Sequence, residues 1–396
     1  MATRVPPYAL SSIGFLFASV FCAAALAQNG NGFKFNNLSV SPYVNLEYEY
    51  DSNVDYDKNE YSDSILRVTP GVDLTYTGND WGLSGNGWYS YDKYLDYNEL
   101  DGNRYGESLR FYREAAKGWR LMLGQRYTKD DQNDSIIDGG RGLWREREET
   151  EWNGALAYEL SEKTEVTLSG MFSDISYAND GDMYSDLYGW QEWSVGLEVA
   201  HRLTEKSNLL LNGSYQEYES DGAKGISSES TGYTLMGGFG SRATERITYR
   251  ALTGVSWFDY AEGDQMQGWT YSLDANWIIN RKVAASISGS SYFQPSESEM
   301  NQAMQVYALS AGLTYRPMRK LSTRFDVAYR REESEYATTD DEALTDDRYS
   351  LRVRTDYQLM RYVTVYGGLE YEDQISNNSD NEFDRYRASL GLSFRY

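Results

Sequence analysis

Cysteine and histidine are almost absent from this sequence of 396 residues. The one cysteine, Cys22, lies near the start of the chain, and the one histidine is His201. If the first 27 residues are removed, as argued below, the rest of the chain has no thiol for a disulfide, a thiolate metal site or a cysteine nucleophile. A formal net charge of −23 also disfavours nucleic-acid binding.

Long apolar runs are missing after residue 27, where none approaches the ~20 residues that a membrane-spanning helix needs. Proline is scarce, at 6 residues, beside 36 tyrosines, 35 glycines and 10 tryptophans. Aromatic side chains pack well on the pleated surface of a strand. If the mature chain enters a membrane, it must do so as strands, in which only alternate residues need to face lipid.

The first 27 residues have a different composition. Arg4 is followed by an apolar run from Tyr8, which ends in Ala25-Leu26-Ala27. This order predicts a secretory signal peptide at 1–27 and a mature domain at 28–396. The alternatives are a membrane anchor, which the small residues after the run disfavour, and a lipoprotein signal at Cys22, which bulky Phe21 disfavours.

Apolar and polar residues alternate through the whole mature sequence, which predicts strands with one apolar and one polar face. The first apolar row is Leu38, Val40, Pro42, Val44, Leu46, Tyr48 and Tyr50, and the last is Tyr386, Ala388, Leu390, Leu392, Phe394 and Tyr396. Counting such rows gives about 18 strands. Short turns alternate with longer polar connections, as in outer-membrane barrels with periplasmic turns and extracellular loops.

The predicted fold is therefore an all-β, antiparallel, up-and-down transmembrane barrel of about 18 strands with acidic extracellular loops. A soluble β-sandwich is the alternative, but the rows carry aromatic residues at their ends and small or aliphatic residues between them, which is typical of a lipid-facing band. Because lipid leaves no backbone group unpaired, the last strand must bond to the first.

The final strand resembles the assembly signal of bacterial outer-membrane barrels, carried here by Leu390, Leu392, Phe394 and Tyr396. This resemblance implies the barrel assembly machinery as a partner. The surrounding outer-membrane lipid and lipopolysaccharide are the other partners that we expect.

Charged residues fall on the inward parity of several strands. The predicted pore-lining set is Arg316, Arg324, Arg330, Arg348, Arg352, Arg354, Arg385, Arg387, Glu47, Glu49 and Asp73, with Arg395 sharing the parity. Closure is expected to bring Glu47 and Glu49 close to Arg385 and Arg387. Two interpretations stay open: ion pairs that satisfy buried charges at the seam, or an arginine wall that favours anionic solutes.

The connections offer few chemical sites. The segment 128–148 is the best candidate for a constriction inside the lumen. The loops 331–347 and 51–63 hold eight and five carboxylates; we interpret them as solvated surface, with binding of divalent cations as the alternative. His201 shares the parity of the lipid-facing residues near the turn end of its strand, so no catalytic residue, metal or cofactor is predicted.

The stretch from Glu47 to Tyr76, with Tyr50-Asp51-Ser52-Asn53-Val54, an acidic loop and Pro70-Gly71, resembles the start of the putative beta-barrel porin type 2 family. The tyrosine-spaced segment 89–97 adds to this resemblance. It implies an outer-membrane barrel, in some cases associated with exopolysaccharide production, without defined catalytic residues.

The function expected from the sequence is a passive, water-filled pore in the outer membrane for small hydrophilic solutes, with anionic solutes as one option, because barrels of 16–18 strands enclose an aqueous channel. The alternatives are a barrel accessory to exopolysaccharide export and a closed structural or adhesive barrel. An enzyme is not expected.

Overall fold

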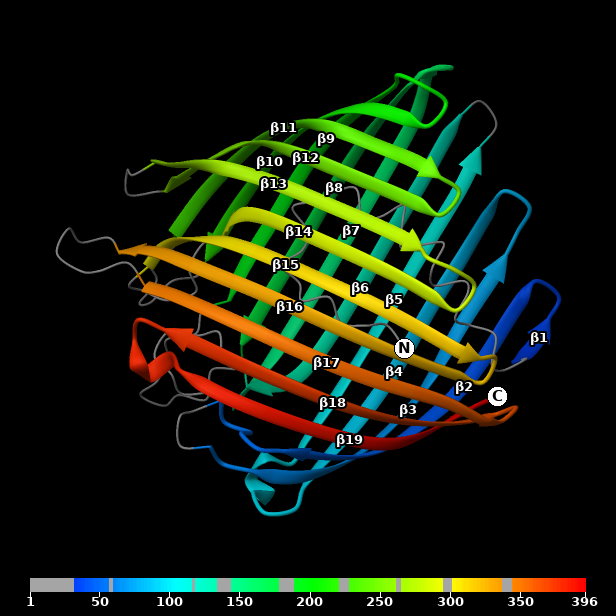
Figure 1. Ribbon diagram of the computed structural model, residues 1–396, viewed down its shortest axis with the longest axis vertical. Helices are drawn as coiled ribbons and strands as arrows, with labels where there is room; N and C mark the ends of the chain where they lie inside the picture. Colours follow the sequence, from blue (N-terminus) through cyan, green and yellow to red (C-terminus); the bar gives the residue numbers. More distant parts are fainter. Residues whose placement is uncertain are drawn as a thin grey trace.

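The computed structural model describes residues 32–56, 60–115, 118–133, 144–177, 189–220, 228–260, 265–294, 301–336 and 344–396. These residues form one antiparallel sheet of 19 strands. Strands β2 to β19 follow one another in chain order, and β19 pairs with β2 to close an 18-stranded barrel (Figure 1). The predicted fold is confirmed.

The strands of the ring are long, as a tilted membrane-spanning sheet requires. Their bounds are β2 (Leu38–Asp51), β3 (Asp63–Thr77), β4 (Trp81–Tyr94), β5 (Gly102–Ala115), β6 (Trp119–Asn133), β7 (Trp144–Ser161), β8 (Thr164–Tyr177), β9 (Trp190–Arg202), β10 (Ser207–Ser220), β11 (Ser228–Thr244), β12 (Ile247–Tyr260), β13 (Gln265–Ile278), β14 (Val283–Gln294), β15 (Asn301–Met318), β16 (Leu321–Tyr336), β17 (Leu344–Met360), β18 (Val363–Ser376) and β19 (Phe383–Arg395). Two short 3₁₀ turns, η2 (Asn98–Leu100) and η4 (Ser379–Asn381), lie in the connections.

The seam between the first and last strands of the ring is staggered. The β19–β2 ladder runs from Arg387 opposite Asp51 to Arg395 opposite Tyr43, so β2 extends past the end of β19. The short strand β1 (Phe33–Phe35) pairs with this extension, and its Phe33 ring lies 4.7 Å from the ring of Tyr396. Figure 1 shows β1 beside the chain end marked C. The overhanging edge of β2 is thereby covered.

Burial in this fold is the reverse of that in a soluble protein. Leu390 is 62% exposed and Leu369 is 64% exposed, whereas Asp51 is 0% and Arg385 is 6% exposed. The apolar rows therefore form the outer surface and the polar rows the inner wall, as the alternation predicts. Among the described residues, no helix is long and apolar enough to cross a membrane.

Aromatic side chains form a belt near each end of the outer surface. We define the long-loop belt as Tyr48, Tyr89, Tyr105, Tyr127, Trp152, Phe172, Trp193, Tyr233, Tyr271, Tyr349 and Tyr386, and the short-turn belt as Trp119, Tyr158, Tyr249, Trp277, Tyr315, Tyr357, Phe394 and Tyr396. Neighbouring rings pack closely: Trp119 and Tyr158 are stacked with their centroids 4.2 Å apart, and the tilted rings of Tyr371 and Tyr386 have centroids 4.7 Å apart. Such belts mark the two membrane–water interfaces.

The two rims of the barrel differ. At the short-turn rim, side-chain oxygens close the turns: Asn280 Oδ1 accepts from the backbone N–H of Lys282 at 2.8 Å, and Thr204 Oγ1 accepts from that of Ser207 at 3.1 Å. This is how Asn and Thr replace backbone hydrogen bonds in tight turns. The longer connections, with η2 and η4, lie at the opposite, long-loop rim.

Candidate functional site: the inner wall

The inner wall beside the seam is a lattice of ion pairs. Arg385 Nε donates to both carboxylate oxygens of Asp51, at 2.8 and 3.0 Å. Arg387 Nη2 lies 2.8 Å from Glu370 Oε1, which also accepts from Arg352. These side chains come from four neighbouring strands, so the lattice ties β17, β18, β19 and β2 together on the inner face.

The expected approach of Glu47 and Glu49 to Arg385 and Arg387 is wrong. In the staggered register Glu49 faces Ser389 and Glu47 faces Gly391, and the residue opposite Arg387 is Asp51. Glu47 and Glu49 instead contact Arg67 of β3, at 2.7 and 3.6 Å. The acidic and basic partners were expected from parity, but the stagger of the ladder decides which of them meet.

Arg67 was not singled out in the sequence, although it has the same inward parity as Asp73. It bonds to Asp92 of β4 at 3.0 Å, and Asp92 also accepts from Arg104 of β5 at 2.6 Å. Applying the same parity rule to the strands at 81–94 and 102–115 would have found both Asp92 and Arg104. The ion-pair lattice therefore extends over β2 to β5.

Most of the other predicted residues are also placed beside polar partners. Arg324 lies 2.7 Å from Asp326, Arg354 lies 3.2 Å from Asp356, and Arg348 donates to Gln374 at 2.9 Å. Arg330 contacts Glu332 and lies 3.3 Å from the Tyr292 hydroxyl, and Asp73 contacts Arg395. Arg316 is exposed at the end of β15, and no carboxylate among the described residues pairs with it.

Inward aromatic rings lie flat against glycines on the neighbouring strand. Tyr43 stands directly opposite Gly71, and Tyr366 directly opposite Gly391. A Cβ atom at Gly71 would come 2.4 Å from Tyr43 Cζ, and one at Gly391 would come 2.3 Å from Tyr366 Cζ. Each ring thus occupies the space that a side chain would take, and this keeps it out of the centre of the barrel.

We predict that Gly71→Ala lowers the single-channel conductance, because the new methyl group must push the Tyr43 ring towards the barrel axis. Removing that ring in Gly71→Ala/Tyr43→Ala should restore or raise the conductance. Gly367→Ala is the matched control, because that glycine faces outwards and an added Cβ meets its nearest atom at 3.4 Å. Recordings in planar bilayers measure all three; equal currents from Gly71→Ala and the wild type would contradict the prediction.

The loop after β2 turns into the mouth of the barrel. Asn53 and Val54 are buried, the Asn53 amide donates to Asp384 O at 3.0 Å, and the Tyr56 ring packs on Phe383 and under Arg385 Cζ, 4.0 Å away. Tyr56 has φ +53°, a left-handed conformation that costs a non-glycine residue energy. Part of the 51–63 loop is therefore packed against the inner end of the wall and is not solvated surface.

The segment 128–148, the constriction expected from the sequence, is described only at its two ends, because residues 134–143 lie outside the described ranges. Its described ends continue β6 and β7, where Arg147 Nε lies 3.3 Å from Asp130 Oδ1. The constriction prediction thus stays open for this segment. Near the mouth, Lys93 Nζ lies 2.5 Å from Asp101 Oδ2, and this hydrogen bond lowers the pKa of the Asp101 carboxyl group.

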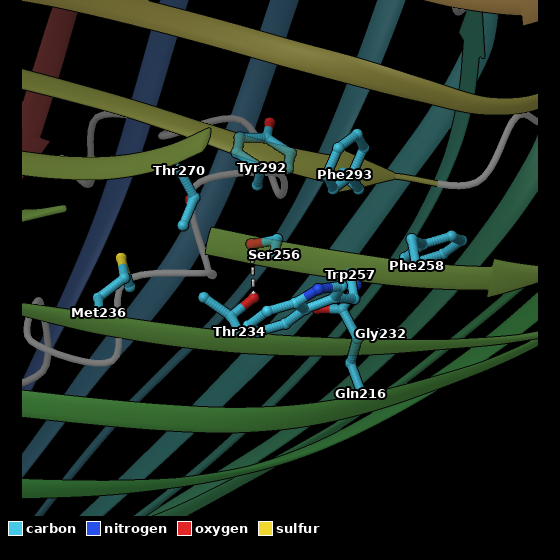
Figure 2. Close-up of a pocket in the computed structure, with 10 residues that line it drawn as sticks. All are labelled: Gln216, Gly232, Thr234, Met236, Ser256, Trp257, Phe258, Thr270, Tyr292 and Phe293. Atoms are coloured by element: carbon cyan, nitrogen blue, oxygen red, sulfur yellow. Dashed lines mark hydrogen bonds between the residues drawn. The ribbon is translucent and has the colours of Figure 1, made fainter. Parts of the chain in front are cut away.

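The wall formed by β10 to β14 is chemically different. Its inner face carries mainly glycine, hydroxyl and apolar side chains, with Leu210, Met236 and Leu252 in one buried cluster. Figure 2 shows the part of this wall towards the long-loop rim, where Thr234 and Ser256 share a 2.8 Å hydrogen bond below Tyr292 and Phe293. The space left among these side chains is about 10 Å³, which is room for one water molecule rather than an organic ligand.

The described residues do not assemble a metal centre. His201 is exposed at the short-turn end of β9, with its Nδ1 atom 3.0 Å from Thr164 Oγ1. Within the described part of the chain, no group of three or more His, Cys, Asp or Glu side chains could hold a metal ion. The polar chemistry is spread along the inner wall rather than gathered at one point.

Comparison with known proteins gives one match at the level of a family. A family model described as putative beta-barrel porin 2 matches residues 30–396. A search of the curated proteins finds no match.

Solved structures with a similar arrangement include two receptors from Pseudomonas aeruginosa and one transporter from Neisseria meningitidis. The siderophore receptor PirA is 10% identical, with a TM-score of 0.44 over 90% of this chain and 80% of that chain. A variant of the ferric enterobactin receptor PfeA is 8% identical, with a TM-score of 0.48 over the same shares. The FrpB iron transporter of N. meningitidis is 11% identical, with a TM-score of 0.47 over 87% of this chain and 63% of that chain.

Proposed function

Because this chain belongs to the putative beta-barrel porin 2 family, we propose that it forms a water-filled pore through which small hydrophilic solutes diffuse passively across the outer membrane. Family membership places the protein in the outer membrane and among transport proteins. The open pore and its solutes go beyond that, and the following features of the inner wall support them.

The observation that carries the proposal is a polar inner wall whose side chains are held close to the sheet. Arginines and carboxylates neutralise one another within the wall, as in the Asp51–Arg385 and Glu47–Arg67 pairs. The large rings of Tyr43 and Tyr366 lie on glycines instead of filling the centre. In an 18-stranded ring, a wall of this kind leaves an aqueous path.

Charge is unevenly distributed around the wall. On the inward faces of β16 to β19 arginines outnumber carboxylates, whereas Glu47, Glu49, Asp51, Asp73 and Asp92 give β2 to β4 an acidic character around Arg67. Oppositely charged sectors create a field across the path, and the arginine-rich sector is the side along which anionic groups would pass. Both interpretations made from the sequence, seam ion pairs and an anion-favouring wall, therefore contribute to the proposal.

A second candidate is passage of a saccharide chain, which Trp88 favours. This inward indole stands opposite Gly106 of β5, with the amide of Asn86 two residues away on the same face of β4. A ring face beside planar polar groups suits a sugar, which has apolar C–H faces and hydroxyl edges. Export of a polymer would require oligosaccharides to pass, whereas a small-solute pore would exclude them.

Reconstitution tests the proposal directly. Purified protein in planar bilayers should give stable, voltage-independent single-channel currents, and liposomes containing it should swell in small neutral sugars with rates that fall as the sugar becomes larger. Folding is checked separately by the heat-dependent shift in electrophoretic mobility of a barrel. A folded protein without current or swelling would overturn the pore and favour the closed structural barrel.

A further inference from the structure

The outer surface of the barrel carries one polar interruption between its aromatic belts. The described lipid-facing residues there are aliphatic, aromatic, glycine, alanine, proline, serine or threonine, with two exceptions, Glu107 of β5 and Gln125 of β6. Glu107 shares the parity of Tyr105 and Leu109, which are 40% and 47% exposed, and Gln125 shares that of Leu123, which is 48% exposed. Both therefore face outwards.

The two exceptions lie side by side at the same depth. Along its strand, Glu107 lies two residues closer to the middle of the membrane than the belt residue Tyr105. Gln125 likewise lies two residues closer to the middle than the belt residue Tyr127. In the β5–β6 ladder Glu107 stands opposite Tyr127, and Gln125 stands opposite Leu109, so the two side chains are diagonal neighbours. They form a single polar spot within the hydrocarbon-facing band.

This polar spot lacks partners among the residues that the structure describes. Glu107 is exposed, and none of the described residues supplies a cation or a hydrogen-bond donor to its carboxylate. Gln125 Oε1 is buried and accepts no hydrogen bond from a described residue. A carboxylate that faces lipid without a partner is unfavourable. In the membrane, a group outside the chain must satisfy the Glu107 carboxylate.

A shallow hollow adjoins the polar spot. Gly87 of β4 stands opposite Glu107, and a Cβ atom built on this glycine would meet nothing within 4 Å. Small residues of this kind let two membrane proteins approach closely. The surface around Glu107 thus combines an unsatisfied carboxylate with room for a neighbour. A protein surface can fill this room and supply a hydrogen-bond donor, which lipid chains cannot.

We propose that the Glu107–Gln125–Gly87 surface is the contact between two copies of this chain in the outer membrane. A two-fold axis along the membrane normal, passing between β5 and β6, places Glu107 of each copy opposite Gln125 of the other. The carboxylate then accepts from the amide N–H₂ group, twice in each dimer, as a self-complementary two-fold interface requires. The negative charge of lipopolysaccharide phosphates makes lipid an unsuitable partner for Glu107.

Exchange of the two polar residues tests this interface. Copies labelled with donor and acceptor dyes are reconstituted into vesicles at falling protein-to-lipid ratios, and energy transfer reports the dimer. Gln125→Glu places carboxylates against carboxylates and should weaken the dimer about tenfold or more at pH 8. Glu107→Gln/Gln125→Glu restores the acceptor and donor with their positions exchanged, and it should recover the dimer.

Two further variants separate the interface from barrel folding. Gly87→Leu fills the hollow and should weaken the dimer, whereas Gly213→Leu, on the lipid face of β10, should not. Glu107→Leu should abolish the dimer and yet raise the thermal stability of the monomer, because it removes a charge from the lipid face. A monomeric wild type, or a Gln125→Glu variant that dimerises like the wild type, would overturn the proposal. None of these readouts depends on whether the pore conducts.

Discussion

Replacing Arg385 with methionine is expected to destabilise the barrel by about 3–5 kcal/mol. The Arg385 side chain is only 7% exposed, and its partner Asp51 is fully buried. Removing the guanidinium group leaves a buried carboxylate whose remaining hydrogen bond comes from the Asn53 backbone N–H at 3.0 Å. Because the pair joins β19 to β2, the loss falls on the seam that closes the ring. Equilibrium urea unfolding of the reconstituted protein measures it.

The double variant Asp51→Asn/Arg385→Met is the control. It removes both charges together and leaves an amide oxygen to accept from the Asn53 N–H group, so it should unfold within about 1 kcal/mol of the wild type. If the single and double variants were equally unstable, the cost would come from lost packing of Arg385 on the Tyr56 ring rather than from an uncompensated charge.

Reversing the charge of Arg352 and Arg354 is expected to shift ion selectivity strongly towards cations. In Arg352→Glu/Arg354→Glu the new carboxylates would stand beside Glu370 and Asp356, the present partners of these arginines. Reversing two charges within a few ångströms of the path should change the ratio of cation to anion permeability by about fivefold to tenfold. The reason is that a single charge 4 Å from a permeating ion changes the energy of that ion by ~1 kcal/mol even in water. Reversal potentials in a salt gradient measure the ratio.

Arg361→Glu provides the matched control for this charge reversal. Arg361 lies in the short turn between β17 and β18, with its guanidinium 5.1 Å from the Tyr362 ring, outside the wall of the lumen. Its reversal should leave the permeability ratio nearly unchanged at 0.15 M salt, where the Debye length is about 8 Å. If the double variant changed the permeability ratio no more than Arg361→Glu does, the arginines of β17 would not face the conducting path.

The ring itself could be predicted from the sequence because the relevant signal is local. Rows such as Leu38 to Tyr50 and Tyr386 to Tyr396 fix the strands and which face meets lipid, and the alternation of turn lengths fixes the connections. Closure then follows from the need to pair every backbone group in lipid. None of these steps requires knowledge of which residues stand opposite one another.

The details of the inner wall could not be predicted because they depend on stagger. The pairing of Arg385 with Asp51, in place of Glu47 or Glu49, results from an offset between strands that are 334 positions apart in the sequence. The packing of Tyr43 on Gly71 likewise requires the β2–β3 register. Tyr56 reaches Arg385 only through a left-handed turn in a loop, which alternation does not signal.

The flat packing of rings on opposite glycines has a consequence for how this wall can change over evolutionary time. A glycine at position 71 that gains a side chain displaces the ring at 43, and a tyrosine that shrinks leaves its glycine facing an unfilled gap. Positions 43 and 71 should therefore be replaced together among relatives, and so should positions 366 and 391. The members of each pair are separated in the sequence, so nothing in the sequence alone marks them as partners.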